Sequence, residues 1–291
     1  MKFKQNLLKN INSIAIGFGL FGFIAFPDVA KANTPEKCTT AIGAKVDGKY
    51  QKTAAQIGNL MTFCTDTPDR FEITIHELGL CTAQPIQAGP PMTFSKNDCV
   101  VTMTSTGVTA DLANSTVSLP SMKGRPPSNT YTHAYIIITN TFGLKGSVTI
   151  KNGSGADVKY CSKTVRSNNS NSTSGTLLGS FCTAEDHTET LNDFGDLTFS
   201  AYFGPEAMDG GGEVSALLTD SNLTTATSSG DVQRLIGVFE TNAGSPVVIS
   251  DSSNGLEMQL TVTDIGYGIE FQNGVPVDFG SMPFKPVFTV F

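Results

Sequence analysis

The sequence contains no tryptophan, only three histidines and no two cysteines in a Cys-x-x-Cys spacing. Carbohydrate-binding domains commonly stack sugar rings on exposed tryptophan or tyrosine, so the missing tryptophan weakens that class without excluding it. Tyr131, Tyr135 and Tyr202 are the candidate platforms that are left. The missing cysteine spacing leaves no support for a zinc ribbon or a thioredoxin-like redox motif.

The histidines lack the neighbours that catalysis or metal binding requires. His76 and Glu77 begin the pattern of a zinc protease, but Leu80 occupies the position of the second histidine. His133 is expected to be a packed strand residue, because a lone histidine has neither the nucleophile nor the orienting partner of a catalytic base. We therefore predict no catalytic residue, no metal site and no cofactor.

Basic patches and phosphate-binding loops are also missing. Residues 210–212 are three glycines, but no basic residue or helix start adjoins them that would hold a phosphate. Removal of residues 1–32 takes away four of the 19 basic and one of the 26 acidic residues, which leaves a formal net charge of −10. This charge is opposite to that of nucleic-acid-binding surfaces, so we predict no nucleic-acid partner.

An acidic run at residues 185–189 is the strongest candidate for a cation site. Oxygen ligands in and after this run are offered by Asp186, Glu189, Asp193 and Asp196, and His187 adds an imidazole. Their spacing matches no calcium-binding loop, and charge clusters between strands usually face water. We therefore predict a solvated acidic loop without a high-affinity metal site.

What the sequence does contain begins with an export signal. Three lysines within the first nine residues precede an apolar run over residues 14–26. Small residues in Ala30-Lys31-Ala32 then predict that a signal peptidase removes residues 1–32 by cleavage before Asn33. An uncleaved anchor is the alternative, but thirteen apolar residues are fewer than the roughly twenty that span a bilayer. The mature chain, which has no membrane span, is predicted to be secreted, periplasmic or located at the cell surface.

The six cysteines, an even number in an exported chain, predict three disulfides rather than metal ligands. Six cysteines allow about fifteen connectivities. We favour pairing between sequence neighbours, because each pair then closes a self-contained segment and contributes on the order of 3 kcal/mol in the chain-entropy model. The predicted pairs are Cys38 with Cys64, Cys81 with Cys99, and Cys161 with Cys182.

The remaining composition favours strands and turns, with 29 glycines, 14 prolines and apolar runs rich in Val, Ile and Phe. Short strand-like segments recur about every ten residues, which predicts an all-β, mainly antiparallel fold of the sandwich or jelly-roll kind. Strands are expected at residues 71–80, 99–104, 115–119, 131–142, 147–151, 157–161, 196–203, 234–240, 247–250, 256–263, 268–271 and 287–291.

Two of these strands have distinctive patterns. Apolar and polar residues alternate from Phe71 to Ile75, and Leu78 and Leu80 continue on the other parity, so a β-bulge is expected near Glu77. Residues 135–138 are apolar without alternation, which predicts a central strand that is covered on both faces.

One N-terminal amphipathic helix is predicted over residues 41–62, where apolar residues recur at intervals of three and four. This apolar stripe consists of Val46, Tyr50, Ala54, Ile57 and Met61. Its face is expected to pack across a sheet.

Turns and loops divide the rest of the chain. Asn254-Gly255 and Asn273-Gly274 are typical of hairpin turns, whereas the polar residues 166–175 predict an exposed loop. Residues 208–213 and 218–230 are expected to be flexible. A boundary near residues 165–190 would divide the chain into two β domains, but we prefer one domain over residues 33–291.

The segment 286–291 is strand-prone and is expected to form an edge strand. It either closes the sheet of its own chain, which we favour, or completes the sheet of another chain by strand addition.

These patterns favour a secreted or cell-surface, non-enzymatic structural or adhesive β protein whose partner is a protein or glycan, with self-assembly among the alternatives. A carbohydrate- or ligand-binding β-sandwich module is the second hypothesis. A hydrolase with a carboxylate pair is the third, since such a pair leaves no spacing pattern in a sequence.

Overall fold

The computed structural model describes residues 35–113, 125–163, 182–195, 198–208, 211–241 and 246–291. The predicted leader at residues 1–32, the strand at 115–119 and the loop at 166–175 lie outside these described residues. The described chain is mostly β, as predicted from its composition. None of the helices in this part of the chain is long and apolar enough to cross a membrane.

The largest sheet has eight strands and is antiparallel throughout. Its strand order is β11-β8-β2-β7-β14-β13-β12, and β5 pairs with β2 beside this path. The strands are β2 (Arg70–Cys81), β5 (Cys99–Asp111), β7 (His133–Thr139), β8 (Thr141–Lys145), β11 (His187–Thr190), β12 (Tyr202–Ala207), β13 (Glu213–Thr219) and β14 (Arg234–Glu240).

Smaller antiparallel sheets adjoin the large one. One has three strands, β1 (Phe63–Asp66), β17 (Tyr267–Gln272) and β18 (Val275–Ser281). The others are pairs: β3 (Ile86–Gln87) with β4 (Thr93–Phe94), β6 (Asn129–Tyr131) with β15 (Val247–Ile249), β9 (Ser147–Lys151) with β10 (Asp157–Cys161), and β16 (Leu256–Thr261) with β19 (Lys285–Val290).

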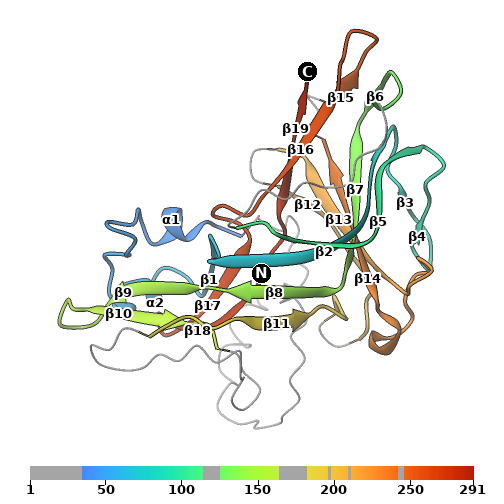
Figure 1. Cartoon of the computed structure of the whole chain (residues 1–291). Helices are drawn as coiled ribbons and strands as arrows, with labels where there is room; N and C mark the ends of the chain where they lie inside the picture. Colours follow the sequence, from blue (N-terminus) through green and yellow to red (C-terminus); the bar gives the residue numbers. More distant parts are fainter. Residues whose placement is uncertain (1–34, 114–124, 164–181, 196–197, 209–210, 242–245) are drawn as a thin grey trace, which may run out of the picture.

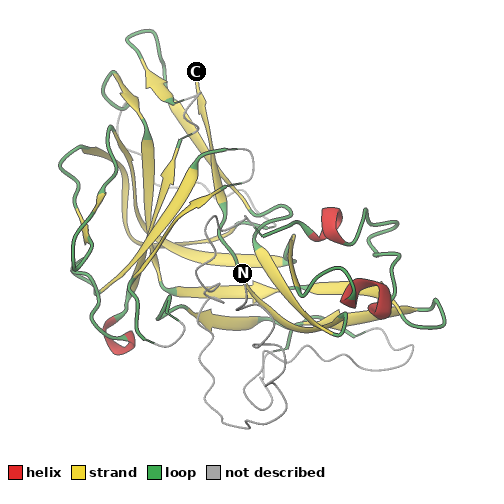
Figure 2. Cartoon of the chain, turned by 180° about the vertical axis from the view of Figure 1, so that it is seen from behind, coloured by secondary structure: helices red, strands yellow, loops and turns green. Residues whose placement is uncertain are grey.

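The strands extend in two arms that meet at the large sheet. In Figure 1, β8, β9, β10 and β11 run across the picture, whereas β6, β15, β16 and β19 run toward the C-terminus at the top. The same view from behind shows the helices α1 (Cys38–Ala41) and α2 (Ala54–Gly58) in the first arm (Figure 2). The last described strand therefore lies at the end of the second arm, away from both helices.

The predicted helix over residues 41–62 is wrong, because only α1 and α2 are helical in this region. Asp47 and Gly48 have φ angles of 51° and 75°, and they form a turn that bridges Val46 and Lys49. Such a turn interrupts a right-handed helix. Val46 is 56% exposed, so the predicted apolar stripe is broken as well.

α2 begins where local chemistry supports a helix. The Thr53 side chain accepts a hydrogen bond from the backbone N–H of Gln56, and the Gln56 side chain accepts one from the backbone N–H of Thr53. This capping box satisfies two donors that the first helical turn leaves without partners. Ile57 of the predicted stripe is buried, but in a helix of one turn.

β2 has the predicted alternation and the predicted bulge. Its register against β5 and β7 shifts between Ile75 and Glu77, and the buried parity changes there. β7 is the predicted central strand: it lies between β2 and β14, and residues 134–138 are buried without alternation.

The strands at residues 147–151, 157–161 and 234–240 have the predicted bounds. The sequence patterns missed β1, β3, β4, β11 and β18, and β13 was assigned to flexible segments or to none. The predicted strand at residues 196–203 overlaps β12 only at Tyr202 and Phe203. β13 lies between β12 and β14, the strands on either side of it in the sequence, and it is buried without alternation from Val214 to Thr219.

The turn at Asn273-Gly274 is confirmed, whereas the one at Asn254-Gly255 is not a hairpin turn. Asn273 and Gly274 have φ angles of 52° and 75° and join the paired strands β17 and β18. Asn254 and Gly255 instead stand between β15 and β16, which pair with other strands, and their N–H groups donate to the Phe291 carbonyl.

The three disulfides have the predicted connectivity. The Cα–Cα distances are 5.0 Å for Cys38–Cys64, 4.0 Å for Cys81–Cys99 and 6.1 Å for Cys161–Cys182. The described chain has no free cysteine. Three disulfides are consistent with an oxidising or extracellular compartment.

Candidate functional site

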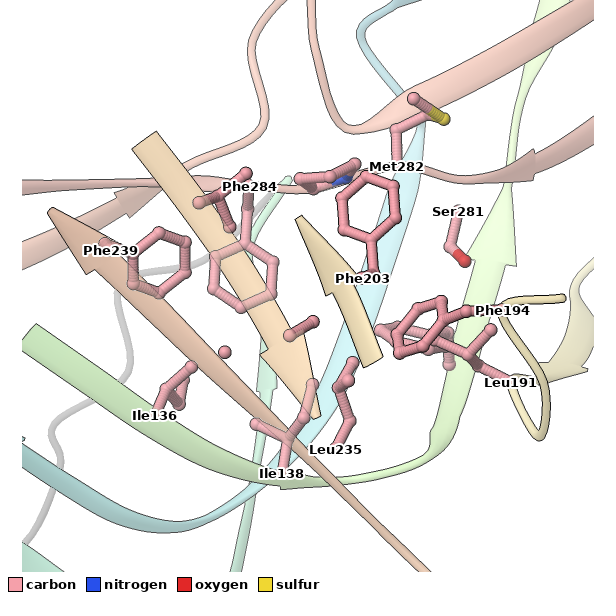
Figure 3. A pocket seen from close by; sticks show the side chains of 15 residues that line it. Ile136, Ile138, Leu191, Phe194, Phe203, Leu235, Phe239, Ser281, Met282 and Phe284 are labelled. Carbon is pink, nitrogen blue, oxygen red and sulfur yellow. The ribbon is translucent and has the colours of Figure 1, made fainter. Parts of the chain in front are cut away.

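An apolar pocket lies between one face of the large sheet and the connection from β18 to β19 (Figure 3). The sheet contributes Ile136, Ile138, Leu235 and Phe239, which are all buried. Residues 281–284 form the opposite side. β18 ends at Ser281, and the buried ring of Phe284 packs back onto the core, where it contacts Phe71 and Phe239.

Two phenylalanine pairs flank this pocket. Phe194 and Phe203 have ring centroids 5.5 Å apart, and Phe239 and Phe284 have centroids 5.8 Å apart. Figure 3 shows the two pairs on opposite sides. Aromatic rings at such distances attract each other in addition to the free energy gained from their burial. Each pair therefore stabilises the wall of the pocket that it forms.

Ser281 is the polar residue of the pocket. Its side chain is 94% buried, and its hydroxyl has no hydrogen-bond partner among the described residues. Its backbone N–H donates to Glu189 Oε2 at 2.6 Å. Ser281 lies at the same end of the pocket as Phe194 and Phe203 (Figure 3). The site therefore combines apolar walls with one buried hydroxyl.

The cavity volume is about 50 Å³. This is roughly one third of the ~150 Å³ apolar cavity that binds benzene in an engineered protein, and far below the ~300–1,000 Å³ of typical ligand sites. The pocket is bordered by the half-buried side chains of Phe203, Met282 and Pro283. A ligand therefore needs local movement at this border in order to enter.

The structure places the three histidines on three different strands. His76 Nε2 lies 3.0 Å from Thr139 Oγ1, and burial together with the charge of Arg234 lowers the pKa of His76. His133 Nδ1 lies 2.9 Å from Thr132 Oγ1, and burial lowers the pKa of His133. Both imidazoles therefore favour the neutral form.

The prediction of a solvated acidic loop at residues 185–189 is wrong in part. Residues 187–190 form β11, which pairs with β8, and His187 and Glu189 are both buried. Edge pairing with β8 binds the backbone, and the Ser281 N–H binds the Glu189 carboxylate. Buried and exposed residues alternate along β11, but the buried ones, His187 and Glu189, are polar. The sequence therefore shows no alternation of apolar and polar residues that would have predicted this strand.

The other predicted acidic residues contact protein donors, where they are described. Asp186 lies 3.4 Å from Arg70, and Asp193 Oδ1 accepts from the N–H groups of Gly195 and Ser200. Asp196 lies outside the described residues. Within the described ranges, no three His, Cys, Asp or Glu side chains are grouped as metal ligands.

Two of the three candidate sugar platforms are buried. Tyr131 and Tyr135 are 3% and 1% exposed, and their hydroxyls donate to the Pro127 carbonyl and to Glu77. Their rings are therefore inaccessible to a sugar. Tyr202 is half-buried.

A second surface feature lies at the end of the C-terminal arm. Val248 of β15, Val287 of β19 and Phe291 are 51%, 43% and 62% exposed. β15 and β19 contact each other, and the Phe291 ring lies over Gly255. We call these three residues the C-terminal apolar end. Val46 and Leu60 are comparably exposed but belong to the N-terminal part of the described chain.

Comparison of the chain with protein-family models, with curated proteins and with solved structures gives no match.

Proposed function

We propose that this chain is a secreted or cell-surface, non-enzymatic structural or adhesive protein that assembles with copies of itself through the strand β19. The observation that carries this proposal is that β19 has a second edge without a ladder partner among the described residues and carries no charged side chain from Pro286 to Phe291. We further propose that the β framework is of the sandwich or jelly-roll kind, which the antiparallel pairing and the multiple small sheets support.

The ribbon is amphipathic and incompletely covered. Leu256 is paired with Val290, and Met258 with Phe288, and these four side chains are half-buried. A two-stranded ribbon is marginal by itself in water, so it depends on what covers its apolar face. The described core covers that face only in part.

β19 also has an edge that can accept another strand. In the described residues, its only ladder partner is β16. Between Pro286 and Phe291 the strand carries no charged side chain, and charges are the usual protection of a strand edge. A second copy that adds its own β19 antiparallel to this edge would form an isologous contact.

The internal pairing of β19 with β16 supports the outcome that we favoured for segment 286–291, closure within the chain. Assembly through β19 then uses its second edge and does not require β19 to leave β16. The three disulfides support the export and extracellular location that the proposal requires.

Sedimentation velocity of the oxidised chain without residues 1–32 tests this proposal. We expect association that increases with protein concentration. Thr289→Lys should abolish this association, because a charged side chain on an edge strand opposes the addition of another strand. The fold should be kept, because Glu257 lies directly opposite on β16 and can pair with the new lysine. The variant should keep the circular dichroism spectrum of the wild type.

A second pair of variants separates edge pairing from general stickiness. V248T/V287T/F291S removes the C-terminal apolar end and should weaken association, whereas V46T/L60S removes two comparably exposed residues elsewhere and should not. A wild-type chain that stays monomeric at all concentrations, or equal association of Thr289→Lys and wild type, would overturn the proposal.

A further inference from the structure

We propose that β12 is a pH-sensitive edge strand, which pairs with β13 more tightly in acid than at neutral pH through protonation of Glu206. β12 is the last strand of the large sheet, and its only ladder partner among the described residues is β13. This inference goes beyond the proposed assembly, because β12 belongs to the large sheet and not to the β16–β19 ribbon.

Few backbone pairs hold β12 in the sheet. Four residue pairs join it to β13, and the register shifts between Phe203 and Glu206. Pro205 lies within this irregularity and has no backbone N–H to donate to the ladder. The pairing of Glu206 and Ala207 therefore depends strongly on the side chains at this end of the strand.

Glu206 carries its charge on the apolar face of the sheet. It lies opposite Val214, which is buried and lines the apolar pocket. A charged carboxylate in such surroundings loses part of its hydration at a high cost, whereas a protonated one loses much less. Burial, followed by the charge of Glu213, accordingly raises the pKa of Glu206 above its usual value of 4.5.

The other titratable groups at this end of the sheet do not neutralise Glu206. Glu213 lies opposite the next residue of β12, and Glu240 and His133 lie opposite each other on β14 and β7. Burial lowers the pKa of His133, so its imidazole favours the neutral form. Asp193 precedes β12, and backbone N–H groups bind its carboxylate. In the described chain, no cation is among the charges that act on Glu206.

The sign of the effect follows from proton binding. The Glu206 carboxylate binds its proton more tightly in the paired strand than in a detached one, so pairing becomes more stable as the pH falls. This contribution is complete below about pH 4.5 and is lost as the pH rises through the raised pKa of Glu206. His133 has the opposite effect on the stability of the whole chain, so the pairing of β12 itself has to be measured.

A change in β12 also reaches the apolar pocket. Phe203 lies on β12, lines the pocket and contacts Phe194. The wall that these two rings form should therefore be more mobile near neutral pH than in acid.

Hydrogen–deuterium exchange of the oxidised chain without residues 1–32 measures this pairing, once each rate is corrected for the intrinsic pH dependence of amide exchange. Protection of the β12 amides should be about three- to tenfold higher at about pH 4.5 than at about pH 7.5. Glu206→Gln keeps the size of the side chain without its charge, so protection of β12 should then be equal at both pH values. Glu257→Gln, an exposed residue of β16, is the control and should behave like the wild type.

Carbon-13 NMR of the Glu206 carboxyl group separates this cause from a general effect of acid. The titration midpoint of Glu206 should lie above the usual 4.5 and should fall in Glu213→Gln, because that variant removes the neighbouring charge. A midpoint at or below the usual value would refute the proposal. So would β12 protection that does not change with pH, or that changes equally in Glu206→Gln and in the wild type.

Discussion

Ser162 and Ser281 are both buried, but their hydroxyls differ in hydrogen bonding. Ser162 Oγ donates to the Glu185 carbonyl at 2.6 Å and accepts from the Gly146 N–H at 3.1 Å, whereas Ser281 Oγ has no partner in the described chain. Ser162→Ala should lower the free energy of unfolding by about 1–3 kcal/mol, and Ser281→Ala should raise it by up to about 1 kcal/mol. Urea denaturation measures both.

The opposite signs make this comparison specific. Both substitutions remove one hydroxyl from a buried serine, so a general effect of size would act on both alike. Destabilisation by Ser281→Ala comparable to that by Ser162→Ala would mean that the Ser281 hydroxyl is satisfied in solution.

His76 and His133 make stability depend on pH. Burial lowers the pKa of each imidazole below the usual value of 6.5, so the folded chain binds fewer protons than the unfolded chain as the pH falls. Their contribution is fully present above about pH 6.5 and is lost as the pH falls through the folded-state pKa. The free energy of unfolding should therefore decrease from about pH 7.5 to about pH 5.5.

The double variant H76Q/H133Q should show a shallower decrease over this range. Urea midpoints at each pH measure the slope, which separates proton binding from any loss of the hydrogen bonds to Thr139 and Thr132. Identical slopes for variant and wild type would contradict the assignment of this pH dependence to the two histidines.

At the scale of elements, the turn between β17 and β18 packs against the helix α2. Gly274 has a φ angle of 75°, and a Cβ built there would lie 1.7 Å from the Ala54 carbonyl oxygen of α2. Gly274→Ala should therefore destabilise the chain by about 2–4 kcal/mol, through backbone strain and displacement of α2.

Gly153 is the matched control, because it lies in the turn between β9 and β10 with nothing within 4 Å of a built Cβ. Gly153→Ala should change stability by no more than about 0.5 kcal/mol. Thermal and urea unfolding of both variants check the difference, and equal effects would show that α2 does not pack on this turn.

At the scale of the whole molecule, the disulfides differ in what else holds the segments they join. Cys81 and Cys99 lie on the paired strands β2 and β5, whereas Cys38–Cys64 joins α1 to β1. Cys38 and Cys64 are fully buried and close a loop with a sequence separation of 26 residues. The double variant C38A/C64A should lose about 3–5 kcal/mol, from loop entropy and from the buried side chains.

C161A/C182A provides the comparison. Its sequence separation is 21 residues, so the loop-entropy model gives a similar loss of about 3 kcal/mol, but Cys182 is only half-buried. We expect the smaller effect for this pair in guanidinium unfolding. A loss below about 1 kcal/mol for C38A/C64A would contradict the role of its disulfide as a structural clamp.

Local patterns in the sequence were sufficient where neighbouring residues decide the structure. The alternation from Phe71 to Ile75, the turn at Asn273-Gly274 and the three disulfides between sequence neighbours were predicted correctly. A strand pattern repeats every two residues, and this kind of turn needs two adjacent residues with positive φ. Both can therefore be recognised from a few consecutive residues.

Local patterns failed where a competing signal or a distant residue decides. Apolar residues in 41–62 have helical spacing, but the turn at Asp47-Gly48 interrupts the chain there and leaves only the short helices α1 and α2 in this region. Glu189 is a charged residue in an acidic run, and its burial depends on the N–H of Ser281, 92 residues later in the chain.

The sequence by itself determined the β class, the disulfide pairing and several strand bounds, and the predicted export signal rests on the sequence alone. Only the tertiary structure decided the candidate site. The pocket joins β7, β13 and β14 to residues 281–284, and the C-terminal apolar end joins β15 to β19. Contacts between segments so far apart depend on how the strands pair, and a periodicity of two residues states which side chains share a face but not which strand lies beside it.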